Sequence, residues 1–159
     1  MNGLYLLLAA RIRQELAAIE LVVARAERAL NLALKNSGEQ DLYLDAVALN
    51  LHDFYSGLER LFTLIGAEID GVKPEGSAWH RDMLSQLTLE LKNIRPAVLS
   101  AQTAKALDEY LRFRHVVRNI YTFELDPHRV ERLVKNLHPT FTQAQTELLA
   151  FADFLEKLV

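Results

Sequence analysis

An apolar stripe near the start of the chain restricts the fold more than any other sequence feature. Between residues 12 and 30, apolar side chains recur at alternating intervals of four and three residues, with arginine, glutamate and glutamine on the opposite side. The stripe consists of Ile12, Leu16, Ile19, Val23, Ala26 and Leu30. This spacing is typical of an α-helix that packs along one face. We therefore expect a long first helix from about Leu4 to Lys35.

The rest of the chain continues in the same helical pattern. The expected elements are a second helix over 41–69, a loop over 70–77, a third helix over 78–93, a fourth that begins near residue 100, and a last helix that begins at 126–127. Asp126 followed by Pro127 is a typical helix start, and Pro139 predicts a kink in the last helix. The sequence contains no strand-type alternation. It therefore predicts a single domain over residues 1–159, an all-α up-and-down bundle of about five helices.

Composition and charge limit the kinds of function. The chain has 159 residues and a formal net charge of -3, so the protein as a whole is not an electrostatic binder of nucleic acid, and any such attraction needs a local patch. The absence of cysteine excludes disulfides, thiol nucleophiles and zinc–thiolate sites, and it is compatible with a reducing cytoplasm. The apolar run Leu4 to Ala10 is too short to span a bilayer and has no preceding basic residues. We expect a cytoplasmic protein that does not enter a membrane.

A polar segment, Arg112 to Asp126 (RFRHVVRNIYTFELD), carries the strongest candidate for chemistry. Placed on a helix with about 100° per residue, it separates into an apolar arc and a broad basic face. The arc contains Phe113, Val116, Val117, Ile120 and Phe123. The basic face contains one row of Arg112, His115 and Asn119 and a second row of Arg114, Arg118 and Tyr121. Arginine clusters with other donors are typical of sites that bind anions, most often phosphate.

The residue pattern alone leaves two interpretations open. The basic face is either an anion site or a solvated surface with salt bridges, such as an i,i+4 pair between Asp108 and Arg112. No metal site is predicted, because the other histidines lie on different elements and form no His-x-x-x-His or Glu-x-x-His pair. Trp79-His80 is expected to anchor the preceding loop onto the bundle. Glu59 is expected to form a surface or interhelix ion pair.

The polar segment resembles the signature region of HEPN-domain proteins, in particular the HepT-like branch of ribonuclease toxins. In that family an arginine is followed after four residues by a histidine, and one residue later by a tyrosine. The family arginine matches Arg114 and the tyrosine matches Tyr121, and Asp126-Pro127 matches the start of the family's last helix. Asn119 stands where the family carries its histidine, while His115 lies directly after Arg114.

The resemblance implies a toxin of a toxin–antitoxin pair that acts as a homodimer and cleaves RNA, with tRNA the expected target, without a metal or other cofactor. In this interpretation Arg114 stabilises the phosphate, and Arg112 and Arg118 bind RNA. Because the amide of Asn119 is neither an acid nor a base near neutral pH, it can donate a hydrogen bond to phosphate but cannot transfer a proton. Either His115 has taken over the acid–base role, or the protein binds RNA with little or no cleavage.

The resemblance also implies a means of control. In the family, a partner nucleotidyltransferase attaches AMP to the tyrosine that matches Tyr121 and silences the toxin. The added phosphate would place negative charge among the arginines. The alternative function is a catalytically inactive HEPN binding module for the nucleotidyltransferase or for nucleotides. A third is a plain helical bundle without an active site.

Overall fold

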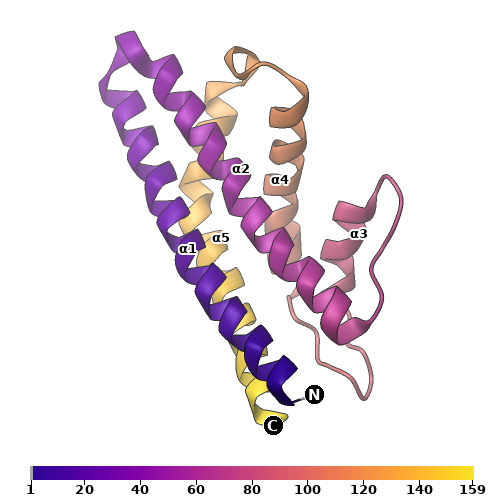
Figure 1. The fold of residues 1–159 in the computed structure, drawn as a ribbon. Coiled ribbons are helices and arrows are strands. Elements are labelled where there is room, and N and C mark those ends of the chain that lie inside the picture. Colours follow the sequence, from indigo (N-terminus) through magenta and orange to yellow (C-terminus); the bar gives the residue numbers. More distant parts are fainter. Residues whose placement is uncertain (1) are drawn as a thin grey trace.

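The computed structural model describes residues 2–159, which form five α-helices and three short helical turns (Figure 1). The helices are α1 (Asn2–Lys35), α2 (Gln40–Ile65), α3 (Trp79–Gln86), α4 (Ala101–Asn119) and α5 (Pro127–Lys157), and the turns are η1 (Ser37–Glu39), η2 (Gly66–Asp70) and η3 (Thr122–Glu124). Residues 2–159 contain no strand beyond one isolated bridge between Leu91 and Arg95. The predicted all-α bundle is therefore confirmed. Within these residues, no helix combines the length and apolarity needed to cross a bilayer.

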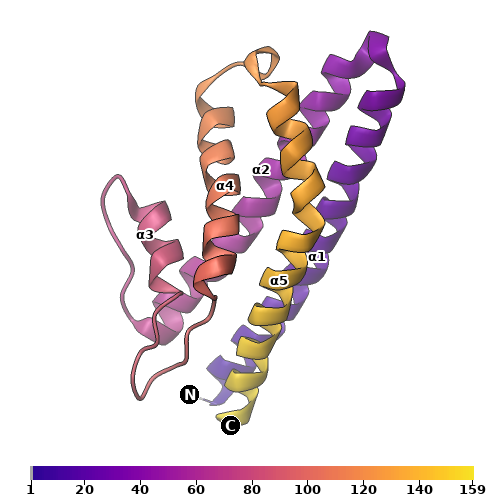
Figure 2. The same cartoon turned by 180° about the vertical axis from the view of Figure 1, so that it is seen from behind.

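Three long helices form the body of the bundle. α1 and α2 make an antiparallel hairpin, and α5 packs along α1, so that the two chain ends lie at the same end of the molecule (Figures 1 and 2). All six residues of the predicted stripe in α1 are buried in the core. α4 packs against α2 and α5, and α3 lies beside α4. The polar segment is thus carried by a helix that contacts three others.

The third helix is shorter than predicted. α3 ends at Gln86, and residues 87–99 form turns around the buried side chain of Arg95. Its Nε and Nη2 donate to the Asp70 carboxylate at 2.6 and 2.8 Å. Its remaining N–H groups donate to the carbonyl oxygens of Gln86, Leu89 and Pro96. A guanidinium needs all of these acceptors when it is buried, and a continued helix would have kept the carbonyl groups for itself.

The fourth helix also ends earlier than the helical wheel assumed. α4 begins with Ser100 as its N-cap, which accepts a hydrogen bond from the Thr103 N–H, and ends at Asn119 because Ile120 is extended. Phe123 therefore does not belong to the apolar arc and is 81% exposed. The prediction that it faces the core is wrong, because the 100° rotation per residue stops where the helix stops.

The start of the last helix agrees with its prediction. Asp126 caps α5 by accepting a hydrogen bond from the His128 N–H at 3.0 Å, and Pro127 occupies the first helical position. α5 continues through Pro139 and changes direction near its midpoint (Figure 2). A proline inside a helix removes one backbone hydrogen bond and bends the helix, as the sequence predicts.

Candidate functional site

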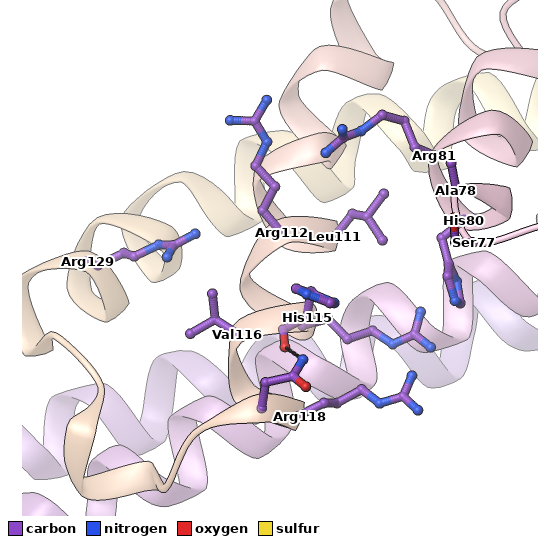
Figure 3. Close-up of a pocket in the computed structure, with 12 residues that line it drawn as sticks. Ser77, Ala78, His80, Arg81, Leu111, Arg112, His115, Val116, Arg118 and Arg129 are labelled. Atoms are coloured by element: carbon purple, nitrogen blue, oxygen red, sulfur yellow. Dashed lines mark hydrogen bonds between the residues drawn. The ribbon is translucent and has the colours of Figure 1, made fainter.

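A groove with a volume of about 850 Å³ opens between the start of α3, the second half of α4 and the start of α5. Its lining residues are Ser77, Ala78, His80, Arg81, Leu111, Arg112, Arg114, His115, Val116, Arg118, Asn119 and Arg129. In Figure 3 the α4 side chains occupy the middle, with Arg129 on one side and His80 and Arg81 on the other. Five of these side chains are arginines and none is acidic. The groove therefore gathers positive charge within an acidic protein.

Five of the six residues singled out in the polar segment line this groove, namely Arg112, Arg114, His115, Arg118 and Asn119. Asn119 is partly engaged, since its side-chain amide donates to the His115 carbonyl oxygen at 2.6 Å. Tyr121 lies apart from them, beyond the end of α4, so it does not form a helical row with Arg114 and Arg118. Its side chain is 71% exposed and stacks on Phe123, with ring centroids 5.4 Å apart.

A buried carboxylate on α2 holds two of the groove's side chains. Glu59 is only 6% exposed. Its Oε1 accepts a hydrogen bond from Arg114 Nη1 at 2.6 Å, and its Oε2 lies 2.8 Å from His80 Nδ1. Three helices thus contribute one side chain each to a single hydrogen-bonded cluster. Of the two alternatives for Glu59, the interhelix ion pair is the one observed.

The cluster is poorly solvated, and two buried polar atoms beside it have no hydrogen-bond partner within residues 2–159. Tyr55 lies one turn before Glu59 and is fully buried, and its hydroxyl has no hydrogen-bond partner within residues 2–159. Burial, and then the nearby charge of Glu59, raise the pKa of Tyr55. Arg114 Nε also has no partner within these residues. Poor solvation around Glu59 strengthens its attraction to Arg114, because charges interact more strongly where the effective dielectric constant is low.

A second carboxylate holds the outer arginines. Asp108 lies 2.8 Å from Arg112 Nε and 3.4 Å from Arg81 Nε, so the expected i,i+4 pair is present but is shared with α3. Arg129 lies over the ring of Phe113, 5.7 Å from its centroid. Within residues 2–159, Arg118 and Arg129 form no salt bridge. Five arginines share two carboxylates, so the groove keeps a net positive charge.

Sequence reasoning missed four residues of this site, namely Glu59, His80, Arg81 and Arg129. His80 was expected only to anchor a loop, and its ring does stack on Trp79 with centroids 3.7 Å apart. A signal existed for Glu59, because it lies four residues after Tyr55 and three before Phe62, a spacing that places its carboxylate beside the apolar face of its helix. No motif links these four residues. Among residues 2–159, no three histidine, aspartate or glutamate side chains are placed to hold a metal ion.

Comparison with known proteins identifies the family. A family model described as "HepT-like protein" matches residues 46–155. The chain belongs to the HepT-like family. The matched range covers most of α2, all of α3 and α4 and most of α5, and it contains every residue that lines the groove. Neither the curated proteins nor the solved structures provide a match. Family membership makes the chain a HEPN-type, toxin-like protein, in agreement with the resemblance seen in its polar segment.

Proposed function

We propose that this HepT-like protein is the toxin of a toxin–antitoxin pair, and that its groove binds RNA and cleaves it without a metal. The observation that carries the proposal is the gathering of five arginines in one groove of a protein with a net charge of -3. A guanidinium remains charged at any physiological pH and binds phosphate oxygens through a planar pair of donors. A single-stranded polyanion is the ligand that best matches such a surface.

Arg114 is assigned to the reacting phosphate. One of its nitrogens is held by Glu59 at 2.6 Å, which orients the guanidinium before substrate binds. Its side chain still lines the groove, so it can stabilise the charge that develops on the phosphate oxygens. Arg112 and Arg118, on either side of it along α4, are assigned to the flanking backbone.

The proposed reaction is attack of the ribose 2′-oxygen on the adjacent phosphorus. This step requires a proton acceptor and a proton donor near neutral pH. Asn119 can supply only hydrogen bonds, whereas His115 is exposed in the groove and carries an imidazole, which can take up or release a proton. His115 is therefore assigned to proton transfer, and tRNA is the proposed target.

We further propose that the active form is a homodimer across the polar segments. The exposed pair Tyr121 and Phe123 lies just beyond α4 and offers apolar surface to a second copy. The exposed phenol of Tyr121 is also open to a partner nucleotidyltransferase. Attachment of AMP there would add negative charge just beyond the helix that carries Arg112, Arg114 and Arg118, and would oppose the binding of RNA to the groove.

Asn119 gives support to a second function. With asparagine at the family's histidine position, a binding module that holds RNA, nucleotides or the nucleotidyltransferase without turnover is the alternative. The two functions differ in what the protein does when it is expressed alone. Growth arrest with RNA breakdown favours the nuclease, and harmless expression favours the binding module.

The decisive experiment uses purified wild-type protein and total tRNA in the presence of EDTA. We expect fragments with 2′,3′-cyclic phosphate and 5′-hydroxyl ends. RNA that binds but remains intact would reject the nuclease in favour of the binding module. Coexpression with the nucleotidyltransferase, followed by intact-mass measurement of wild type and Tyr121→Phe, tests the control. Mass increments of AMP size that persist in Tyr121→Phe would remove Tyr121 from it.

A further inference from the structure

His80 has the geometry of a proton acceptor. Its Nδ1 lies 2.8 Å from Glu59 Oε2, and its ring lines the groove opposite Arg129 (Figure 3). The stacked ring of Trp79 limits its rotation. An ionised carboxylate accepts a hydrogen bond, so it selects the tautomer with the proton on Nδ1. The lone pair is then on Nε2, the other ring nitrogen.

His115 lacks this support. Within residues 2–159, its ring makes no hydrogen bond and no salt bridge to any side chain, and it is exposed. A histidine that acts as a base is usually oriented by a third group, commonly a carboxylate on the opposite ring nitrogen. His80 has such a group and His115 does not. The two histidines are therefore suited to different tasks.

Glu59 links the proton acceptor to the phosphate site. Its two oxygens hold His80 from α3 and Arg114 from α4. We propose that His80 is the general base of RNA cleavage, that Glu59 positions both His80 and Arg114, and that His115 is left as the proton donor. This inference rests on the proposed nuclease function and assigns a residue outside the polar segment to it.

His80 Nε2 takes the proton of the 2′-hydroxyl while the 2′-oxygen forms a bond to phosphorus. The bond between phosphorus and the 5′-oxygen breaks, and that oxygen takes a proton from the His115 imidazolium. The products are a 2′,3′-cyclic phosphate and a 5′-hydroxyl. Within residues 2–159, the charged groups that face this part of the groove include Glu59 from α2, which contacts His80, and Arg114 and Asp108 from α4, which pair with Glu59 and Arg81. Arg81 and Asp82 follow His80 on its own helix.

The test compares His80→Gln with His138→Gln, a control at an exposed position on α5 outside the groove. The measurements are RNA affinity and the single-turnover cleavage rate under saturating protein, as a function of pH. We expect His80→Gln to bind RNA within about twofold of wild type and to cleave about 100-fold more slowly, with loss of the acidic limb of the pH–rate profile. The control should match wild type in both measurements.

A positioning role for Glu59 has its own signature. Glu59→Gln should slow cleavage and weaken RNA binding together, because the variant releases both His80 and Arg114. His80→Ala should regain part of its cleavage rate when free imidazole is added, whereas a purely structural defect would not respond. If His80→Gln loses RNA binding, His80→Asn takes its place as the folded variant.

The outcomes separate the two proposals. If wild type cleaves RNA and both His80→Gln and His80→Asn cleave it as fast as wild type, the role of His80 is overturned and the nuclease function stays intact. A wild type that binds RNA without cleaving it overturns both. Slow cleavage that imidazole does not rescue in His80→Ala, with the pH profile unchanged, also removes His80 as the base.

Discussion

The buried ion pair between Arg95 and Asp70 supports a strong expectation about stability. Both side chains are almost fully buried, at 0% and 1% exposed, and they form two hydrogen bonds at 2.6 and 2.8 Å. Arg95 also donates to three backbone carbonyl groups. Replacement of Arg95 with methionine keeps the apolar part of the side chain. It leaves the Asp70 carboxylate and the three carbonyl groups buried without the donors that Arg95 supplies. Removing one partner of a buried pair costs about 3–5 kcal/mol.

A Coulomb estimate gives a similar magnitude. The Coulomb attraction of two charges about 4 Å apart is about 4 kcal/mol at the effective dielectric constant of about 20 that describes protein sites. For a protein of this size, each kcal/mol shifts the melting temperature by about 2–4 °C. We therefore expect Arg95→Met to lower the free energy of unfolding by about 3–5 kcal/mol and the melting temperature by about 10 °C.

The assay is urea unfolding followed by circular dichroism, with Arg60→Met as the matched control. Arg60 also forms an ion pair, with Glu15 at 2.9 Å, but its side chain is 69% exposed, so its loss should cost only about 0.2–1 kcal/mol. The double variant Asp70→Leu with Arg95→Met should recover part of the loss, because it removes the isolated charge. Equal stabilities for Arg95→Met and Arg60→Met would refute the reasoning.

Three further expectations concern buried hydroxyl groups, the groove and the dimer. Tyr55→Phe should be neutral or stabilising, because the Tyr55 hydroxyl has no hydrogen-bond partner among the described residues. Tyr110→Phe should cost about 1 kcal/mol, because it removes a 2.7 Å hydrogen bond to the Leu133 carbonyl. Burial raises the pKa of Tyr55, so the folded protein keeps the phenol proton, while the unfolded chain loses it above about pH 10. The free energy of unfolding should therefore fall as the pH rises above that value, and it should fall less steeply in Tyr55→Phe. Urea unfolding between pH 8 and about 11 measures this difference. Arg118→Gln should weaken RNA binding and reduce the slope of log affinity against log salt by about 0.7. The control Arg28→Gln, on α1 and outside the groove, should change neither the affinity nor the slope. An unchanged slope in Arg118→Gln would place the RNA elsewhere. Phe123→Ser should raise the dissociation constant of the proposed homodimer in sedimentation measurements, and an unaltered constant would move the interface away from η3.

The helices themselves follow from local sequence. The stripe from Ile12 to Leu30 has a helical period, and each of its residues is buried in α1. The start of α5 at Asp126-Pro127 could be predicted, because its capping hydrogen bond joins residues only two positions apart in the chain. Such features depend on neighbours in the chain, so they can be read without knowing the fold. The family resemblance likewise rests on one short segment and is confirmed by the family match.

The ends of α3 and α4 depend on contacts that the local pattern does not contain. Asp70 and Arg95 are 25 residues apart in the chain, and their buried pair redirects residues 87–99 away from a helix that apolar spacing alone would continue. The end of α4 at Asn119 removes Tyr121 from its expected row with Arg114 and Arg118. It also places Phe123 at the surface, although the spacing of Phe123 matches the apolar face of a longer helix. Helical periodicity in the sequence does not show where a long-range contact will end the helix.

The identity of the basic segment is a property of the sequence, whereas the site around it is decided by the tertiary structure. Arg112, Arg114 and Arg118 lie within seven positions of one helix, and Arg114 and Arg118 are one turn apart, so the cluster is visible from the sequence alone. Glu59 is 55 residues from Arg114 and 21 from His80, and only the packing of α2, α3 and α4 brings the three together. Local periodicity determines which face of its own helix a residue occupies. Its partner on another helix depends on how whole helix faces pack together, and no short segment encodes that packing.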